Sequence, residues 1–350
     1  MFSYSGNVIS AKARTMYGQC LKEKNYEELL LCHSVGEVAA YLKTRTCYAA
    51  ALSDVNEATI HRGYLEFLLR QKRNRDYAAL NRYDKTIGLP ITTYLTEQEE
   101  TEQLMRFLRL FSAGHAEEFL LRSPLSDSGK SRLDLKRLSQ CRTYDQLLQE
   151  LTGLPYRRIL EARPPENGVL PLTRIENALY RRLTRTLLGI IEGTRGELRR
   201  QLRELCGAQI DSQNVTRILR LKQFFGADPD TIRRELLPTV GGISGKMLEK
   251  MVEADTPEEV MRLFRYTPMG RTLPEEQYPF TYDLYLRVPY FSARHYIHFS
   301  SYPMVVLISF LVLTQAELDD ITNIIEGIRY GLPPEQIRPM LVLTHQKGGD

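Results

Sequence analysis

Thr143-Tyr-Asp-Gln146 has the pattern of a helix start, and the same pattern occurs twice more in this chain of 350 residues, at Ser34-Val-Gly-Glu37 and Thr256-Pro-Glu-Glu259. Each is a capping box, in which a hydroxyl accepts from the third backbone amide and the Glu or Gln side chain reaches back to the first. The intervals between the boxes are 143 − 34 = 109 and 256 − 143 = 113 residues. Three similar helix starts at nearly equal intervals predict a helical unit that occurs three times.

The residues around the boxes support this prediction. A small residue stands two positions before each box: Cys32, Cys141 and Ala254. A large apolar residue follows eight positions after the start of each box: Leu42, Leu151 and Phe264. Each helix then ends in a similar turn: Thr46-Cys47-Tyr48, Leu154-Pro155-Tyr156 and Thr267-Pro268-Met269. A second pattern predicts a helix, a turn that ends in glycine and another helix. It comprises Val215, Ile218, Leu219, Gly226, Ile232 and Leu236, recurs as Ile321, Ile324, Ile325, Gly331, Ile337 and Leu341, and has a weaker echo in Leu104, Phe107, Leu108 and Gly114.

We therefore predict an all-α protein of three helical repeats with pseudo-threefold symmetry, at residues 1–98, 99–210 and 211–314. Convincing alternating strands are absent from the sequence. Residues 315–350 repeat only part of the unit, so their apolar face would stay bare unless it packed on existing helices. We expect this C-terminal helical pair to close the last repeat.

Composition narrows the classes of function. The chain has 47 basic and 43 acidic residues, a net charge of +4, which is nearly balanced rather than strongly basic as expected of a nucleic-acid binder. The longest apolar run, Met304–Leu313, is about half the roughly 20 residues needed to span a bilayer. Five widely spaced cysteines without a C-x-x-C motif indicate a reducing compartment. These features, with no signal-peptide pattern at the N-terminus, predict a cytoplasmic protein that does not itself cross a membrane.

No catalytic, cofactor or metal site is predicted. Gly129-Lys130-Ser131 resembles the end of a phosphate-binding loop, but Pro124 stands where the first glycine is required. The Gly241–Lys246 segment fails in the same way and predicts a turn before a helix. His295 and His298 could share a helix face, yet no third zinc ligand stands at a suitable spacing, so a packed or surface pair is favoured.

A basic face lies opposite an apolar stripe in residues 172–206, and it includes Arg181, Arg182 and Arg185. Such a face is normally solvated, since exposed charge accompanies a buried stripe. The alternative is contact with acidic loops of a partner, which would guide docking more than hold it, because exposed ion pairs contribute only about 0 to 1 kcal/mol each.

The repeated segments resemble the central-stalk socket subunit of rotary ATPases, called the d subunit in V-type and the C subunit in A/V-type enzymes. The resemblance covers nearly the whole chain and is most specific at 7–14 with 34–48, 175–179, 214–238 and 317–341. It implies a closed funnel of helices and a non-catalytic role. It also implies two partners, the membrane rotor ring and the central stalk, and a place at the cytoplasmic face of the membrane. The resemblance leaves open whether H⁺ or Na⁺ is transported.

The resemblance carries no catalytic motif, so roles are assigned to regions. We expect the turns at Tyr48, Tyr156 and Met269 to occupy equivalent positions at one end of the funnel and to form an interface, with the arginine face as a second candidate. No nucleic acid or small-molecule substrate is expected. Two alternatives are a free-standing helical scaffold, whose usual period of 34 to 47 residues is far shorter, and an RNA-binding helical protein.

Overall fold

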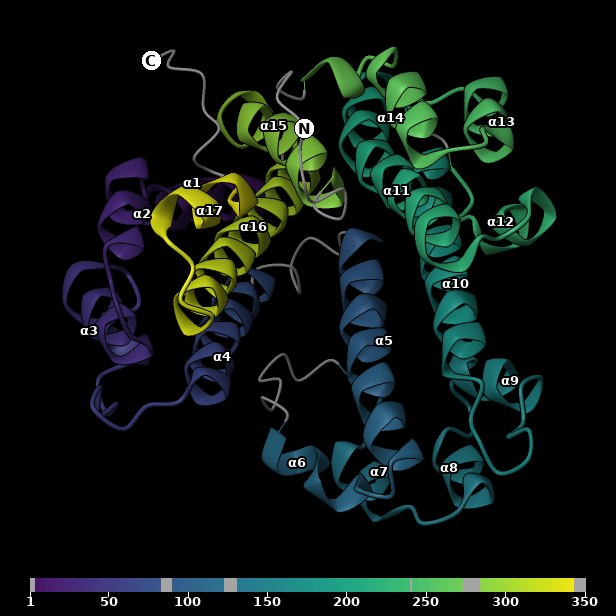
Figure 1. Ribbon diagram of the computed structural model, residues 1–350, viewed down its shortest axis with the longest axis horizontal. Coiled ribbons are helices and arrows are strands. Elements are labelled where there is room, and N and C mark those ends of the chain that lie inside the picture. The colour runs from purple at the N-terminus through teal and green to yellow at the C-terminus, as the bar shows by residue number, and fades with distance from the viewer. Residues whose placement is uncertain (1–3, 83–89, 123–130, 240, 273–283, 343–350) are drawn as a thin grey trace. The chain divides into compact units, whose positions relative to one another are not determined.

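The computed structural model describes residues 4–82, 90–122, 131–239, 241–272 and 284–342 (Figure 1). These residues form α-helices and short 3-10 helices, with an isolated β-bridge between Glu166 and Val169 and no strand in the described ranges, so the all-α prediction is confirmed. The chain divides into two compact units, residues 1–73 with 194–350 (unit 1) and residues 74–193 (unit 2). The predicted repeat boundaries at 98, 210 and 314 stay predictions.

The elements follow one another along the chain as follows: α1 (Tyr4–Gly18), α2 (Glu23–Leu30), α3 (Val35–Arg45), η1 (Ala49–Ala51), α4 (Arg62–Asn81), α5 (Pro90–Ser112), η3 (Ala116–Glu118), α6 (Phe119–Arg122), α7 (Leu135–Gln140), α8 (Tyr144–Glu150), α9 (Pro155–Glu161), α10 (Leu172–Gly193), α11 (Gly196–Phe225), α12 (Pro229–Glu235), α13 (Gly245–Glu253), α14 (Pro257–Arg265), η4 (Gly270–Thr272), α15 (Leu284–Phe299), α16 (Pro303–Arg329), α17 (Pro334–Ile337) and η6 (Arg338–Met340).

The three predicted helix starts are the N-termini of α3, α8 and α14. Ser34, Thr143 and Thr256 each accept from the backbone N–H three residues later. The reciprocal bond differs in detail: Gln146 accepts from the backbone N–H of Thr143, whereas Glu37 and Glu259 accept from the residue before the cap. The hydroxyl half of each box is therefore confirmed, and the carboxylates of α3 and α14 extend the cap by one residue.

Thr143→Ala should lower the free energy of unfolding by about 1 kcal/mol, because the N–H of Gln146 would lose its acceptor. Thr173→Ala is the matched control, since Thr173 is exposed in the same unit and should change stability by less than about 0.5 kcal/mol. Urea denaturation of both variants measures the difference. Equal stabilities would show that the Thr143 cap contributes nothing.

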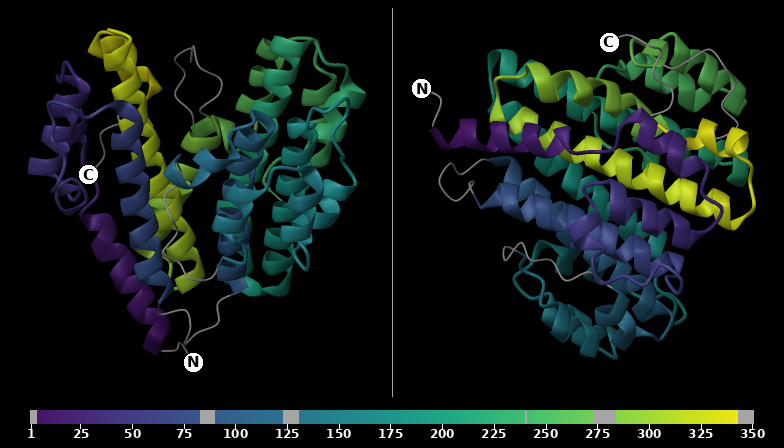
Figure 2. Two further views of the ribbon diagram at one scale, coloured as in Figure 1. Left: turned by 90° about the horizontal axis from the view of Figure 1, so that it is seen from below. Right: turned by 90° about the vertical axis from the view of Figure 1, so that its left-hand side faces the viewer.

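In unit 1, α15 and α16 form a helical hairpin, and α11 packs beside α15 (Figure 1). The hairpin turns at residues 300–302 because Pro303 occupies the first turn of α16 and cannot continue a preceding helix. Helix α1 lies along α16, as the right-hand view of Figure 2 shows. At one point this packing is tight, since a Cβ on Gly6 would stand 2.9 Å from the ring of Pro303.

Among the described residues of unit 1, we distinguish two core clusters. The first core cluster joins buried residues of α2, α3 and α4 to those of the C-terminal elements, including Leu318, Ile321, Ile324, Ile325, Ile337 and Leu341. The third core cluster combines α11 to α14 and includes Val215, Ile218, Leu219, Val260 and Phe264. The C-terminal helical pair thus packs on the N-terminal helices, and Arg287 of the last predicted repeat donates to the carbonyl oxygen of Pro339, so the closing of that repeat stays a prediction. The apolar face of the pair is covered as expected, but the covering helices lie at the other end of the sequence, which local patterns do not reveal.

Unit 2 contains the second core cluster, built between α5, α7, α8, α9 and α10. Helices α5 and α10 pack along each other. The apolar stripe of α10 is buried at Ile175, Leu179, Leu183 and Leu187, as its spacing predicts. Helix α10 ends at Gly193, so the apolar stripe predicted within residues 172–206 is divided between α10 and α11.

The turn glycines explain how each long helix ends. Gly226 follows α11 with φ of 53°, and Gly331 follows α16 with φ of 67°. Residues with a Cβ rarely adopt this left-handed conformation, so glycine is the residue expected there. The predicted pattern of helix, glycine turn and helix is confirmed at both places. In the described ranges, no helix is both long and apolar enough to span a bilayer.

Candidate functional site

Helix α16 carries Glu317 into the first core cluster, where the side chain is only 3% exposed. The Tyr48 hydroxyl donates to Glu317 Oε1 at 2.7 Å, and the backbone N–H of Leu21 donates to Oε2 at 2.6 Å. Leu21 lies between α1 and α2, and Tyr48 lies in the turn after α3. One carboxylate therefore ties two turns of the N-terminal region to the C-terminal helix.

A second buried carboxylate holds unit 2 together. Glu100 on α5 is fully buried and accepts the Tyr156 hydroxyl at 2.6 Å from the start of α9. It also accepts from the backbone N–H of Arg132 at 2.6 Å, and the Arg132 guanidinium pairs with it at 2.6 Å. Burial and the neighbouring Glu100 raise the pKa of Tyr156, so the phenol keeps its proton and remains a donor.

The third carboxylate is Asp211 on α11, which is 1% exposed. It accepts from the backbone N–H of Ile243 at 2.9 Å and from the Thr239 hydroxyl. The carboxylate lies against Gly241, where a Cβ would stand 2.0 Å from Asp211 Oδ2. Burial raises the pKa of Asp211, although these hydrogen bonds oppose the rise. No tyrosine takes part here: Met269 follows the corresponding helix and packs on the third core cluster.

The sequence patterns contained these carboxylates without singling them out. Glu100, Asp211 and Glu317 stand four residues before Leu104, Val215 and Ile321, the first apolar residues of the second pattern. Each carboxylate binds the backbone just ahead of a short helix, α7, α13 or α2. A search for polar residues at a fixed distance from the apolar pattern would have found them. Their burial could not be foreseen, because charged residues are normally exposed.

The predicted interface residues lie in different environments. The Tyr48 and Tyr156 side chains are buried and donate to carboxylates, so in this conformation they do not face a partner. Met269 is partly buried. The interface assignment of the three turns remains a prediction that rests on their exposed neighbours.

The arginine face of α10 is partly used inside unit 2. Arg182 pairs with Glu97 of α5 at 3.2 Å, and the Thr186 hydroxyl donates to the same carboxylate at 2.9 Å. Glu97 is almost fully buried, so this contact links α10 to α5 rather than to a partner. Arg181 is half-buried, and Arg185 is exposed to solvent.

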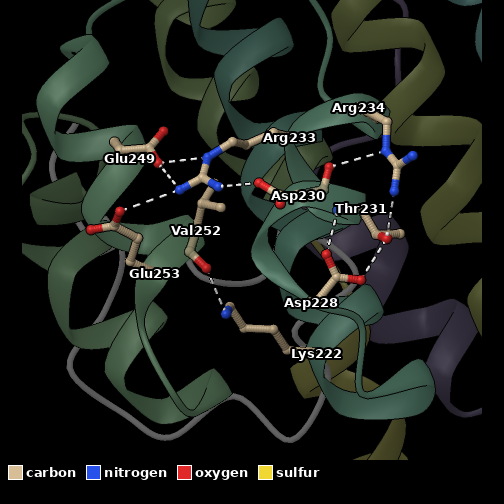
Figure 3. Close-up of polar contacts among 9 residues, drawn as sticks. All are labelled: Lys222, Asp228, Asp230, Thr231, Arg233, Arg234, Glu249, Val252 and Glu253. Atoms are coloured by element: carbon tan, nitrogen blue, oxygen red, sulfur yellow. Dashed lines mark hydrogen bonds and ion pairs between the residues drawn. The ribbon is translucent and has the colours of Figure 1, made fainter.

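The end of the third core cluster carries a polar network between α11, α12 and α13 (Figure 3). Lys222 donates to the carbonyl oxygen of Val252 at 2.7 Å, near the end of α13. Arg233 on α12 contacts Glu249 at 2.7 Å and Glu253 at 3.2 Å on α13. Exposed pairs of this kind contribute little energy, so they fix the orientation of the short helices rather than stabilise them strongly.

The residues that could have supported catalysis are engaged otherwise. Ser244 caps α13, which makes the Gly241–Lys246 segment a turn before a helix, as predicted. His298 packs edge-on against Tyr17, with ring centroids 5.6 Å apart. In the described ranges, no cluster of three or more His, Cys, Asp or Glu side chains could hold a metal ion. Gly129 and Lys130 of the apparent phosphate loop lie outside the described residues.

Burial keeps the thiols of Cys206 and Cys32 in the protonated form at neutral pH. Burial raises the pKa of Cys206 to about 12, and burial, followed by the charge of Glu37, raises that of Cys32 to about 11. A thiol that keeps its proton at neutral pH reacts slowly, since the thiolate is the reactive form. The site formed by the buried carboxylates Glu100, Asp211 and Glu317 is therefore structural, because each carboxylate connects a turn to a long helix.

Glu317 predicts a pH dependence of stability. Its pKa is raised above 4.5 because burial outweighs the hydrogen bonds from Tyr48 and Leu21. The folded state then binds the proton more tightly than the unfolded state, so the contribution of Glu317 is complete below the ordinary pKa and is lost as pH rises through the folded pKa. The advantage in free energy of unfolding over Glu317→Gln should therefore shrink as pH rises from 4.5, in urea denaturation over a pH series. An advantage that grows with pH would contradict this.

Comparisons with known proteins identify the family. The family described as "ATP synthase (C/AC39) subunit" matches residues 9–340. The chain is 24% identical over 221 residues to the C subunit of the A-type ATP synthase of Pyrococcus furiosus, a match covering 61% of this chain and 58% of that protein. It is 26% identical over 214 residues to the C subunit of the A-type ATP synthase of Methanosphaera stadtmanae, covering 61% of this chain and 53% of that protein. The matches thus span little more than half the length of these relatives. The chain belongs to the ATP synthase (C/AC39) subunit family.

Proposed function

We propose that this chain connects the central stalk of an A- or V-type ATP synthase to its membrane rotor ring and transmits torque between them. Membership of a family of non-catalytic ATP synthase subunits carries the proposal. In this role the protein is peripheral on the cytoplasmic face of the membrane. It takes no part in ATP hydrolysis or in ion transfer, which belong to other subunits.

We further propose that the fold consists of three copies of one unit: a long helix with a buried carboxylate, a glycine turn, short helices, a capped helix and a final turn. The second copy runs from α5 to α9, and the third from α11 to η4. The first copy is split, with α16 and α17 supplying its beginning and α2 to η1 its end. The contact of Glu317 with Leu21 and Tyr48 supports this assignment.

A split first copy supports a closed funnel. In an open array the two terminal copies would each need a polar cap. Here the C-terminal helices complete the N-terminal core cluster, so the chain supplies its own closure. Buried carboxylates with satisfied hydrogen bonds also favour a single rigid arrangement of each turn. Rigidity is what a part that transmits torque requires, because compliance would store the work instead of passing it on.

An exposed arginine accompanies each of the three turns. Arg45 precedes the first turn, Arg158 follows the second and Arg271 follows the third. No hydrogen bond or ion pair to the side chains of these arginines is found within the described residues. We propose that these arginines, rather than the buried Tyr48 and Tyr156, present the interface to an acidic partner surface.

The triple variant Arg45→Glu, Arg158→Glu and Arg271→Glu tests this role. The variant should lose co-purification with central-stalk subunits or with the ring from solubilised membranes, because charge reversal replaces attraction by repulsion. Lys24→Glu, Lys136→Glu and Lys246→Glu form the matched control, with the same change of charge on α2, α7 and α13. Unchanged co-purification of the first triple variant with both stalk and ring would refute the assignment of the turns. Wild-type protein that associates with neither would refute the proposed function itself.

A further inference from the structure

Two segments without a single acidic residue meet at one end of unit 1. Residues 1–22 and 284–316 contain no Asp or Glu, although 43 of the 350 residues are acidic. Lys12, Arg14, Lys22, Arg287 and Arg294 lie in these segments. Because most of residues 304–316 are buried, the surface where the two segments touch is formed by α1 and the end of α15, and neither segment supplies a carboxylate to it.

Hydrogen bonds fix α1 beside the end of α15. Arg14 donates from Nε to the carbonyl oxygen of Ile297 at 2.7 Å and from Nη2 to that of Ser300 at 2.6 Å. These are carbonyl groups at the C-terminal end of a helix, where the helix dipole is negative. The guanidinium therefore neutralises the negative end of α15.

A group of aromatic rings lies next to the contact between Arg14 and the end of α15. Tyr17 meets His298 at a centroid distance of 5.6 Å, and His295 meets Phe299 at 5.0 Å. Phe299 is 76% exposed, and both histidines are exposed. Tyr17, His298, Phe299 and His295 thus form a group of neighbouring rings rather than a single exposed side chain.

The charges that act on His298 are all positive. Burial and then Arg294, Arg14 and Lys22 lower the pKa of His298, and no acidic group acts on it. The Lys22 ammonium lies 5.2 Å from the centre of the Tyr17 ring. Glu204 approaches from α11, where it accepts from Tyr296 at 2.6 Å and pairs with Arg200 at 3.3 Å. Glu317 of α16 also acts on Tyr17, but it is buried and accepts from Tyr48 and from the backbone of Leu21.

We propose that the surface formed by Tyr17, Lys22, Arg294, His295, His298 and Phe299 docks on the interfacial layer of an anionic phospholipid bilayer. Aromatic side chains concentrate at the headgroup level of membranes, and cations near an anionic leaflet contribute about 1 kcal/mol each. A protein partner would need a pocket for Phe299 and a sizeable surrounding interface. A headgroup layer accepts an isolated ring flanked by cations without a preformed pocket.

This contact is too weak to anchor the chain alone. Two cations, Lys22 and Arg294, and two aromatic rings, Tyr17 and Phe299, give less than the two-signal anchoring of stably bound peripheral proteins. Within a membrane complex the same contact becomes intramolecular, so even a weak affinity orients the protein. The inference itself does not depend on the proposed function, because vesicle binding is a property of the isolated chain.

Co-sedimentation of the purified full chain with vesicles tests the proposal. Vesicles of phosphatidylcholine with about one third phosphatidylglycerol should bind the protein at about 50 mM salt and release it at about 500 mM, whereas pure phosphatidylcholine should bind much less. Arg294→Gln should lower the partition coefficient about fivefold, and Phe299→Ser about tenfold. The matched controls are Lys246→Gln and Phe225→Ser, because Lys246 is exposed and Phe225 is 73% exposed elsewhere on the same unit. Both controls should bind like wild type.

Two outcomes would overturn the proposal, and a third would separate it from the proposed function. Equal loss of binding in the control variants would show that only net charge and general surface apolarity matter. Binding to polyglutamate or to RNA without binding to anionic vesicles would assign the surface to another class of partner. Wild-type protein that binds anionic vesicles but does not co-purify with the membrane rotor ring would refute the proposed rotor role and leave this inference standing.

Discussion

Glu100→Ala should lower the free energy of unfolding of unit 2 by about 3 to 4 kcal/mol, since it removes the acceptor shared by Tyr156 and Arg132 and leaves a cavity in the core. The carboxylate is fully buried and accepts from the Tyr156 hydroxyl and from both the backbone N–H and the guanidinium of Arg132. The half-exposed Arg132 guanidinium can turn to water, and the backbone N–H of Arg132 is only partly buried, but the Tyr156 hydroxyl would remain buried without an acceptor. Such a group costs about 1 to 3 kcal/mol.

Glu102→Ala is the control, because Glu102 lies on the same helix and is half-buried, and the distance to its ion-pair partner Arg106 is long, 3.9 Å. It should change stability by less than about 1 kcal/mol. Tyr156→Phe should fall between the two, since it removes a single hydrogen bond worth about 1 kcal/mol. Urea denaturation followed by circular dichroism measures all three. A loss for Glu100→Ala no larger than that for Glu102→Ala would show that the buried carboxylate does not hold the turn of α9.

Gly207→Ala should destabilise the protein by about 2 to 3 kcal/mol, although alanine is the better helix former. A Cβ on Gly207 would stand 2.6 Å from the Cα of Gly241, and Gly241 itself is covered by the Asp211 carboxylate. The backbone of this turn would have to move away from α11. The movement would lengthen the hydrogen bond from Ile243 to Asp211, so overpacking and a weakened buried bond add together.

Gly189→Ala provides a control with the same chemical change inside another helix. A Cβ on Gly189 meets no atom within 4 Å, so this substitution should stabilise the protein by about 0.5 to 1 kcal/mol. Thermal and urea denaturation of both variants distinguish packing from helix propensity. Stabilisation by both substitutions would show that α11 and the turn at Gly241 are not in close contact.

The buried carboxylates relate stability to the proposed mechanical role. A buried charge stabilises a fold less than apolar packing of the same volume would, so its presence indicates a requirement other than stability. Here each carboxylate accepts from a backbone amide that only one position of the turn can present. We infer that the three carboxylates select one orientation of each turn relative to its long helix.

The sequence by itself determined the local features of this protein. The three helix caps, the glycine turns after α11 and α16 and the buried stripe of α10 follow from interactions between residues a few positions apart. Such interactions are encoded by spacing alone, so they could be predicted. The family resemblance rests on the same spacings, and the family match over residues 9–340 confirms it.

Only the tertiary structure decided which distant segments meet. Tyr48 and Glu317 are 269 residues apart, and the C-terminal helices complete the N-terminal core cluster. Only the tertiary structure likewise decides that Arg182 of α10 pairs with Glu97 of α5, which is 85 residues away in sequence. An apolar face or a charged side chain specifies that it needs a partner but not which one. That choice depends on the shape of the whole packed chain, because many segments could satisfy the same local requirement.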